Sequence, residues 1–384
     1  MNIYLDNNAT TRPHQNVINA MLTCLAEVYA NPSSTHLSGR MAKGHIENAR
    51  QAVAKMIGCR IPDSIIFTSC GTESISQAFF IASEVQLNKN SHFIISGVEH
   101  SAVQETSEYH ASKGSHISVV GVDGNGNLDL KQLRQLLTKT SKGSFVSLML
   151  ANNETGVIFP IAEIAEICKI HGVYLHVDAV QAAGKLPFNV EELGCHYLSL
   201  SAHKFHGPKG VGALYICPGA PKVSFIRGHQ ENGMRGGTEN LPGIVGMGVA
   251  AESVVRSLSS DIERMKELRD RLESLVIDAI PGTAVNGDTA SRLCNTSNIY
   301  FPGRNAANLV EQLSARGVYV SAGAACSTGG KPSHVLRAMG MSDERANASL
   351  RFSLSKSTTV QEIDLAVAAI TIANSSSLTI YNVM

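Results

Sequence analysis

Short apolar runs alternate with amphipathic stretches from about residue 60 to residue 220, and this alternation constrains the fold more than any other feature. The strand-like runs cover 64–69, 92–97, 144–150 and 173–179, and the helix-like stretches after the first three cover 73–85, 101–113 and 161–172. Strands that alternate with helices predict an α/β domain around a mostly parallel sheet. Ligands of such sheets gather at the carboxyl ends of the strands, so candidate site residues directly follow the runs. These positions are 69–72, 99–100, 152–153, 178 and 201–204.

The composition is that of a packed soluble protein with a small-molecule ligand. Hydrophobic residues make up 43% of the chain and charged residues 17%, and 32 basic residues balance 32 acidic ones. This balance gives no global attraction to nucleic acid or to anionic lipid. The start of the chain lacks the basic-then-apolar pattern of a secretory signal, and no apolar run reaches the ~20 residues of a membrane helix. We therefore expect a cytoplasmic protein that binds neither a membrane nor nucleic acid directly.

The rhythm of the chain changes near residue 256, where a long charged helix follows. We expect a large domain over 14–256, and a smaller α+β domain built from 1–13 and 257–384. Thr359 and Glu362 form a capping-box pattern for a last helix that runs to about Ala373. Gly246 and Gly248 imitate a dinucleotide-binding fingerprint, but no strand-like run precedes them. We expect these two glycines to allow close helix packing instead.

The eight cysteines show neither C-x-x-C pairs nor the His spacing of a zinc site, so no metal is expected. Six of them lie in apolar or mixed segments and are expected to be small buried hydrophobes. Cys70 and Cys326 lie in loops. Cys326 belongs to the stretch SAGAACSTGGKPS, whose small residues and glycines cannot build a rigid core contact. A free thiol is only a few per cent ionised near neutral pH, so a nearby base or positive charge should assist Cys326.

Two residues together indicate chemistry with pyridoxal phosphate (PLP). Lys204 lies in SAHKFHGPKG, directly after the apolar run YLSLS, and Asp178 ends the run VYLHVD. PLP enzymes need a lysine that binds the cofactor covalently and an acid that keeps its pyridine nitrogen protonated, so that the ring can accept electrons. A lone lysine there would more often be a solvated loop residue.

The segment SCGTES, residues 69–74, offers a phosphate site. Gly71 lets the backbone approach closely, Thr72 supplies a hydroxyl, and the following helix presents its N-terminal amides. Ordinary helix capping would explain this segment equally well if it stood alone.

Nine segments in order resemble the signature segments of NifS/IscS-type cysteine desulfurases. They are NNAT, TSCGTES, EHSAV, NNETG, HVDAVQ, SAHKFHGPKG, RGGTEN, GAACS and LRFSLS, and they span nearly the whole chain. The resemblance implies the aspartate-aminotransferase-like fold of the fold type I PLP enzymes, with a large domain around a mostly parallel seven-stranded sheet. It also implies a homodimer with active sites at the subunit interface.

The resemblance implies a role for each matching residue. Lys204 would bind PLP and later move the α-proton of L-cysteine, and His100 would stack on the ring and act as acid or base. Cys326 would receive the sulfur as a persulfide. Asp178 would pair with the pyridine nitrogen and Gln181 with the phenolic oxygen. The phosphate ligands would be Gly71, Thr72, Ser201, His203 and the partner subunit's Thr238, and the substrate carboxylate would be held by Arg351 and by Asn152, which would also contact the cofactor.

Other functions stay open at this point, because the cofactor site alone does not choose the reaction. An aminotransferase or a selenocysteine lyase would share the fold, although transamination needs no loop thiol such as Cys326. A non-catalytic sulfur-assembly scaffold would not need Lys204, Asp178, His100 and Arg351 together. The sulfur-acceptor protein could belong to iron–sulfur cluster assembly, tRNA thiolation or DNA phosphorothioation. Cys70 stands where many relatives carry glycine, and we expect it to be a packing residue.

Overall fold

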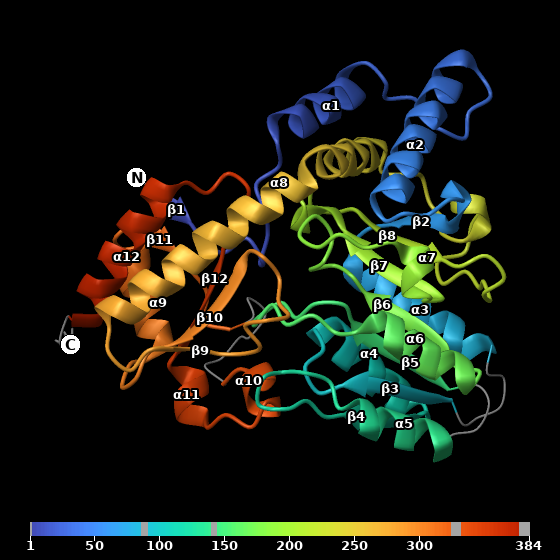
Figure 1. Ribbon diagram of the computed structural model, residues 1–384. Helices are drawn as coiled ribbons and strands as arrows, with labels where there is room; N and C mark the ends of the chain where they lie inside the picture. Colours follow the sequence, from blue (N-terminus) through green and yellow to red (C-terminus); the bar gives the residue numbers. More distant parts are fainter. Residues whose placement is uncertain (1, 86–90, 140–143, 324–331, 376–384) are drawn as a thin grey trace, which may run out of the picture.

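A seven-stranded mixed sheet forms the centre of the protein in the computed structural model, which describes residues 2–85, 91–139, 144–323 and 332–375 (Figure 1). Its order is β2-β8-β7-β6-β5-β3-β4, and only β8 runs antiparallel to its neighbours. The strands are β2 (Ile65–Thr68), β3 (His92–Ser96), β4 (His116–Val120), β5 (Phe145–Met149), β6 (Tyr174–Asp178), β7 (Tyr197–Ser201) and β8 (Gly212–Ile216). The predicted α/β fold with a mostly parallel sheet is confirmed.

Helices cover both faces of this sheet, so its central strands are buried throughout. They are α3 (Gly71–Val85), α4 (Ser101–Ser112), α5 (Leu130–Lys139), α6 (Ile161–Ile170) and α7 (Val190–Leu193). Successive strand residues enter different hydrophobic clusters: Ile94 and Val146 pack on one face, whereas Phe93 and Phe145 pack on the other. The apolar runs are unbroken because each strand must fill a core on both sides.

A second core surrounds a smaller sheet of order β12-β10-β9 (Figure 1). Its strands are β9 (Ala284–Val285), β10 (Thr296–Tyr300) and β12 (Ser349–Ser353), and β1 (Ile3–Tyr4) pairs separately with β11 (Val318–Tyr319). The helices of this part are α9 (Ala306–Ser314), α10 (His334–Ala338), α11 (Asp343–Asn347) and α12 (Val360–Ser375). Thr359 and Glu362 cap α12 reciprocally, as predicted, and the helix continues two residues beyond Ala373.

The remaining helices are α1 (Gln15–Ala26), α2 (Leu37–Met56) and α8 (Leu241–Ala279). The 39 residues of α8 form one continuous helix that crosses the expected domain boundary near residue 256, with Val254 in the first core and Leu268 in the second. The predicted division of the chain stays a prediction, although the two cores support it. Val335 and Leu336 of α10 pack into the first core, on the side of the large sheet.

One helix among the described residues, α8, is long and apolar enough to cross a membrane by length and composition alone. Half of its apolar window is buried inside the protein, where α8 packs against α1 and α2. The core helix of a soluble protein has the same properties. The expected absence of a membrane therefore stays a prediction.

The described cysteines are free thiols. Five of the six that were expected to be buried are buried, namely Cys24, Cys59, Cys168, Cys195 and Cys294. The sixth, Cys217, is half-buried, because it directly follows β8 where the chain leaves the core. Cys326 lies outside the described residues.

Two glycines of α8 bring this helix close to its neighbours. A Cβ atom added to Gly248 would lie 2.6 Å from the Cα atom of Ala49 on α2, and one added to Gly246 would lie 3.0 Å from Cγ of Met21 on α1. Real Cβ atoms do not approach backbone atoms as closely as 2.6 Å. The prediction that these glycines serve helix packing is confirmed.

We predict that Gly248→Ala lowers the free energy of unfolding by about 1–3 kcal/mol, because the new methyl group overpacks the contact with α2. Gly44→Ala is the matched control: Gly44 is an exposed residue of α2 whose added Cβ would meet no atom within 4 Å. This control should gain up to ~1 kcal/mol from helix propensity. Denaturant unfolding of the cofactor-free variants measures both effects, and a Gly248→Ala variant as stable as the control would contradict the packing argument.

Candidate active site

A cavity of about 220 Å³ lies at the carboxyl ends of the parallel strands. Eight of the predicted site residues line it: Gly71, Thr72, His100, Asp178, Gln181, Ser201, His203 and Lys204. They come from β6, β7 and the starts of α3 and α4, as expected for the ligand-binding edge of an α/β sheet. The structure thus brings together residues that lie up to 133 positions apart in the sequence, from Gly71 to Lys204.

Lys204 ends a short 3-10 helix, Ala202–Lys204, that directly follows β7. Its Nζ atom donates hydrogen bonds to the carbonyl oxygens of Asn8 (2.6 Å) and Ala9 (2.9 Å). The amino-terminal segment therefore forms one wall of the cavity and holds the lysine in it. Sequence reasoning assigned the NNAT segment only as a family signature and missed this contact.

Asp178 is the last residue of β6, and only 6% of its surface is exposed. Its Oδ1 atom accepts a hydrogen bond from the backbone N–H of Val180 at 2.9 Å. Burial raises the pKa of Asp178 to about 6, although the Val180 N–H and the positive charge of Lys204 oppose this shift. A buried carboxylate of this kind is stabilised by a cation, and a protonated pyridine nitrogen is a cation of suitable size.

His100 precedes the first turn of α4 and acts as its N-cap. Its Nδ1 atom accepts the backbone N–H of Ala102 at 3.1 Å, and this hydrogen bond assigns the ring proton to Nε2. Burial, followed by the charges of Lys204 and His334, lowers the pKa of His100 to about 4. The ring is therefore neutral at pH 7 and can both stack on an aromatic cofactor and exchange a proton at Nε2.

The start of α3 fits a phosphate group. A Cβ atom at Gly71 would lie 3.0 Å from Cγ2 of Val180, so a larger residue would crowd this edge of the cavity. The first amides of a helix lack intrahelical acceptors, and the positive end of the helix dipole favours an anion. Cys70 caps the helix, since its Sγ accepts the N–H of Glu73 at 3.4 Å. The groups around the cavity thus suit PLP: a lysine, a buried acid and a phosphate site.

Asn152 does not line the cavity, whereas the neighbouring Asn153 does, so the role of Asn152 as a ligand stays a prediction. The Oδ1 atom of Asn152 accepts the N–H groups of Glu154 (2.8 Å) and Thr155 (2.9 Å), and its Nδ2 donates to the carbonyl oxygen of Val98. Its oxygen builds the turn of NNETG, and its NH₂ group bonds to Val98 and to the sulfur of Met149. An Asn that bonds to backbone groups two and three residues later is a known turn pattern, and this signal could have distinguished the two residues.

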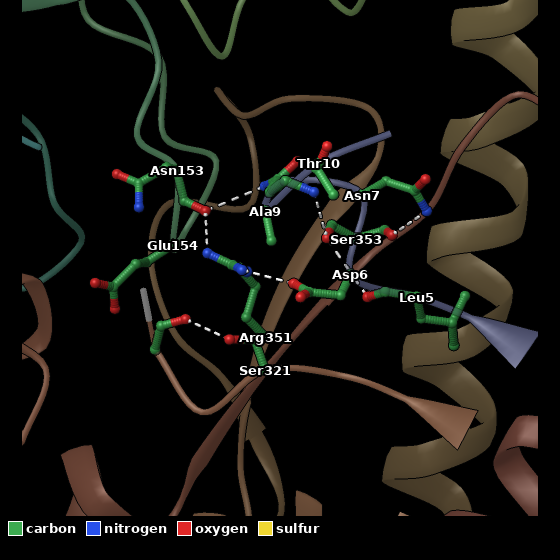
Figure 2. A network of polar contacts seen from close by, with 12 residues as sticks. Leu5, Asp6, Asn7, Ala9, Thr10, Asn153, Glu154, Ser321, Arg351 and Ser353 are labelled. Atoms are coloured by element: carbon green, nitrogen blue, oxygen red, sulfur yellow. Dashed lines mark hydrogen bonds and ion pairs between the residues drawn. The ribbon is translucent and has the colours of Figure 1, made fainter. Parts of the chain in front are cut away.

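Arg351 of β12 lies beside the cavity rather than among its lining residues, and its surface is 1% exposed. Figure 2 shows its guanidinium between Asp6 and Asn153: Nη2 donates to Oδ1 of Asp6 at 2.7 Å, and Nη1 donates to the carbonyl oxygen of Asn153 at 3.2 Å. Its Nε has no hydrogen-bond partner among the described residues. The role of Arg351 in substrate binding stays a prediction, and Asp6 is a site residue that sequence reasoning missed.

The predicted phosphate ligand Thr238 does not line this cavity either. Thr238 lines a separate hollow together with Ser69 and Arg235, so it does not reach the Lys204 of its own chain. Cys326 lies outside the described residues. The residues on either side of its segment both approach Glu154: Ser333 donates its hydroxyl to Oε2 at 2.6 Å, and a Cβ on Gly323 would lie 3.6 Å from the same oxygen. Since Glu154 follows Asn153, which lines the cavity, Gly323 and Ser333 lie near the cavity.

Comparison with known proteins agrees with this geometry. Residues 3–365 match the model of the aminotransferase class-V family. A curated relative, cysteine desulfurase 2 of Trichormus variabilis, is 45% identical over 94% of this chain and 90% of its own length. A solved NifS-like protein superposes with a TM-score of 0.90 at 40% identity, over 97% of this chain and 99% of that one. A structure described as SspA in complex with cysteine has a TM-score of 0.80 at 29% identity, over 93% and 99% of the two chains.

The chain belongs to the aminotransferase class-V family. Within that family its similarity is to cysteine desulfurases of the NifS type. The family and the fold type predicted from the sequence motifs are confirmed, and with them the prediction of PLP as the cofactor.

We predict that Asp178→Asn stabilises the cofactor-free protein at pH 8 and not at pH 4. The folded-state pKa of about 6 lies above the ordinary 3.8, so ionisation of Asp178 costs stability as the pH rises between these values, and the loss is complete above about pH 6. An uncharged Asn avoids this loss and should gain about 1–3 kcal/mol at pH 8. Unfolding by denaturant at both pH values measures the gain, with exposed Asp63→Asn as control. An equal effect at pH 4 and pH 8 would refute the electrostatic cause.

Proposed function

We propose that this protein is a PLP-dependent cysteine desulfurase, which converts L-cysteine to L-alanine and keeps the sulfur as a persulfide on Cys326. The observation that carries the proposal is a single cavity that joins Lys204, the buried acid Asp178 and the neutral His100. The names of its relatives support the reaction, and the SspA structure in complex with cysteine supports the substrate.

When bound, PLP supplies an electron sink for the electron pair that remains when the substrate Cα loses its proton. Lys204 first holds the cofactor, and its Nζ is then placed to take this proton, because the amino-terminal carbonyl groups keep it inside the cavity. Asp178 provides the negative charge opposite the pyridine nitrogen. The imidazole of His100 is neutral at pH 7. Its Nδ1 caps α4, and its other nitrogen, Nε2, carries the N–H that can donate a proton.

The sulfur transfer balances without an external oxidant. The thiolate of Cys326 forms a bond to the substrate sulfur while the bond between that sulfur and Cβ breaks. Cβ keeps the electron pair of the broken bond and takes up one proton to become the methyl group of alanine. One cysteine and one enzyme thiol thus give one alanine and one enzyme persulfide. The persulfide is then available to the thiol of a sulfur-acceptor protein, whose pathway this chemistry does not select.

We predict that Cys326→Ser still binds PLP and changes its absorption spectrum with L-cysteine, but forms alanine at least about tenfold more slowly, because the sulfur has no acceptor thiol. Lys204→Ala is the paired variant, and it should lose covalently bound PLP after borohydride treatment. Alanine and sulfide are measured with a thiol reductant present. Near-normal alanine formation from L-cysteine by Cys326→Ser would contradict the nucleophile role of Cys326. If Cys326→Ser forms alanine from L-selenocysteine as fast as the wild-type protein does, the result would favour a selenocysteine lyase.

We also propose that the protein is a homodimer that completes its phosphate site with the partner subunit's Thr238. Support comes from the apolar side chains that α1 and α2 expose where they project from the body (Figure 1). Leu22 and Leu25 of α1 are 57% and 62% exposed, Tyr29 between α1 and α2 is 79% exposed, and Leu37 and Met41 of α2 are 66% and 52% exposed. Such patches mark interaction surfaces. Light scattering should give twice the chain mass of 40.9 kDa, and a monomer at micromolar concentration would overturn this proposal.

A further inference from the structure

Lys185 is a buried lysine for which the reaction described above has no use. Only 5% of its surface is exposed, and among the described residues no carboxylate forms an ion pair with it. Its Nζ donates instead to two oxygens of Gln181, the side-chain Oε1 at 3.0 Å and the backbone oxygen at 3.2 Å. A buried amine without an acid is costly to charge, so its position calls for a reason.

The fold fixes Lys185 closely behind the site. Gly184 adopts φ +75°, and a Cβ at this position would lie 2.8 Å from Cβ of Phe205, the residue after Lys204. The backbone oxygen of Lys185 also accepts the thiol of Cys294 at 3.4 Å. The turn that carries Lys185 is therefore packed against the segment that carries Lys204, and neither side chain can shift far without the other.

The contacts of Lys185 decide how the amide of Gln181 is oriented. An amine nitrogen donates to Oε1, so the NH₂ group of Gln181 points the other way, where Nε2 donates to the carbonyl oxygen of Asn8 at 2.9 Å. The same Asn8 oxygen accepts Nζ of Lys204 at 2.6 Å. An amide nitrogen has two hydrogens, and Gln181 lines the cavity. One N–H thus remains for a ligand there.

We propose that Lys185 is a positioning residue, which holds the NH₂ group of Gln181 toward the phenolic oxygen of bound PLP. The inference rests on the proposed cofactor and adds a residue that acts through Gln181. A hydrogen-bond donor to the phenolic oxygen stabilises the ionised form of that oxygen. The donor therefore lowers the pKa of the proton that the oxygen shares with the neighbouring nitrogen of Lys204. Without Lys185 the amide is oriented by its bond to Asn8 alone, so a turn that brings its oxygen to the cavity and repels an ionised oxygen becomes less costly.

Besides burial, the cationic groups Lys204 and Arg351 lower the pKa of Lys185, whereas Cys294 raises it. Lys204, His206 and Lys356 line the small cavity on its other side together with Asp261, and Arg351 and Cys294 face it from the second core. Asp261 is the one acid among these groups, and it is engaged by Lys356 at 3.6 Å and by Ser257. Burial, followed by the charge of Lys204, lowers the pKa of Lys185 to about 7. Both forms of the amine can donate to Gln181.

The test is a pH titration of the visible absorption band of bound PLP. Its midpoint should rise by about one pH unit in Lys185→Met, since part of a hydrogen bond to an ionised oxygen is lost. Lys185→Arg, which keeps a hydrogen-bond donor, should have a midpoint close to that of the wild-type protein. Lys356→Met is the matched control, because Lys356 lines the same small cavity without contacting Gln181, and its midpoint should stay within ~0.3 units of wild type.

A double variant separates positioning from mere packing. In a Gln181→Leu background, Lys185→Met should cause no further shift, because the contact through which it acts is gone. If Lys185→Met does not fold, the comparison of Lys185→Arg and Lys185→Gln in both backgrounds carries the same test. An unchanged midpoint in folded, PLP-binding Lys185→Met, or an equal shift caused by Lys185→Met in the Gln181→Leu background, would overturn the inference alone. A wild-type protein that shows no PLP band would instead overturn the proposed function.

Discussion

The hydrogen bonds of the amino-terminal segment 6–11, in which Asn7, Asn8 and Thr11 are buried, hold the site together. One backbone oxygen, that of Asn8, accepts both Nζ of Lys204 and Nε2 of Gln181. The side chain of Asn8 donates to the carbonyl oxygen of Asn153, which also accepts from Arg351. Because each buried polar group left without a partner costs about 1–3 kcal/mol, this segment cannot leave without exposing the groups of both cores. The large sheet supplies the site residues, but the amino-terminal segment fixes their geometry.

Patterns that depend on local sequence could be predicted, and this covers most of the large sheet. Asp178 and Lys204 each end or follow a continuous apolar run, so their place at the sheet edge could be inferred from the order of residues alone. The strands β4 and β8 were missed. β4 is an edge strand with exposed residues, and its run HISVV is short and partly polar. β8 follows a glycine-rich loop and enters the sheet antiparallel between β2 and β7, an order that no local pattern encodes.

Partner choice among buried polar side chains could not be predicted in the same way. Asn152 and Asn153 are identical neighbours: the oxygen of Asn152 bonds within a local turn, whereas the place of Asn153 at the cavity depends on the folded structure. Asp6 is separated from Arg351 by 345 residues. Lys185 resembles an ordinary loop lysine in the sequence, because its burial depends on the packing of Gly184 against Phe205. Chemistry that requires a particular residue type is visible in a sequence, whereas the residues that orient it become visible only after folding.

The hydrogen bonds between the two ends of the chain also determine the order in which parts of the protein can fold during synthesis. Asn7 donates its side-chain N–H to the carbonyl oxygen of Ser353, which lies 346 residues further on. At roughly 5–20 residues per second, a ribosome needs on the order of 20–70 s to make that acceptor after Asn7 has emerged. During this interval the amino-terminal segment has no native partner in the second core. A chain cut short on the ribosome therefore carries Lys204 and the carbonyl groups that hold it, but not the Ser353 carbonyl that ties this wall of the cavity to the second core.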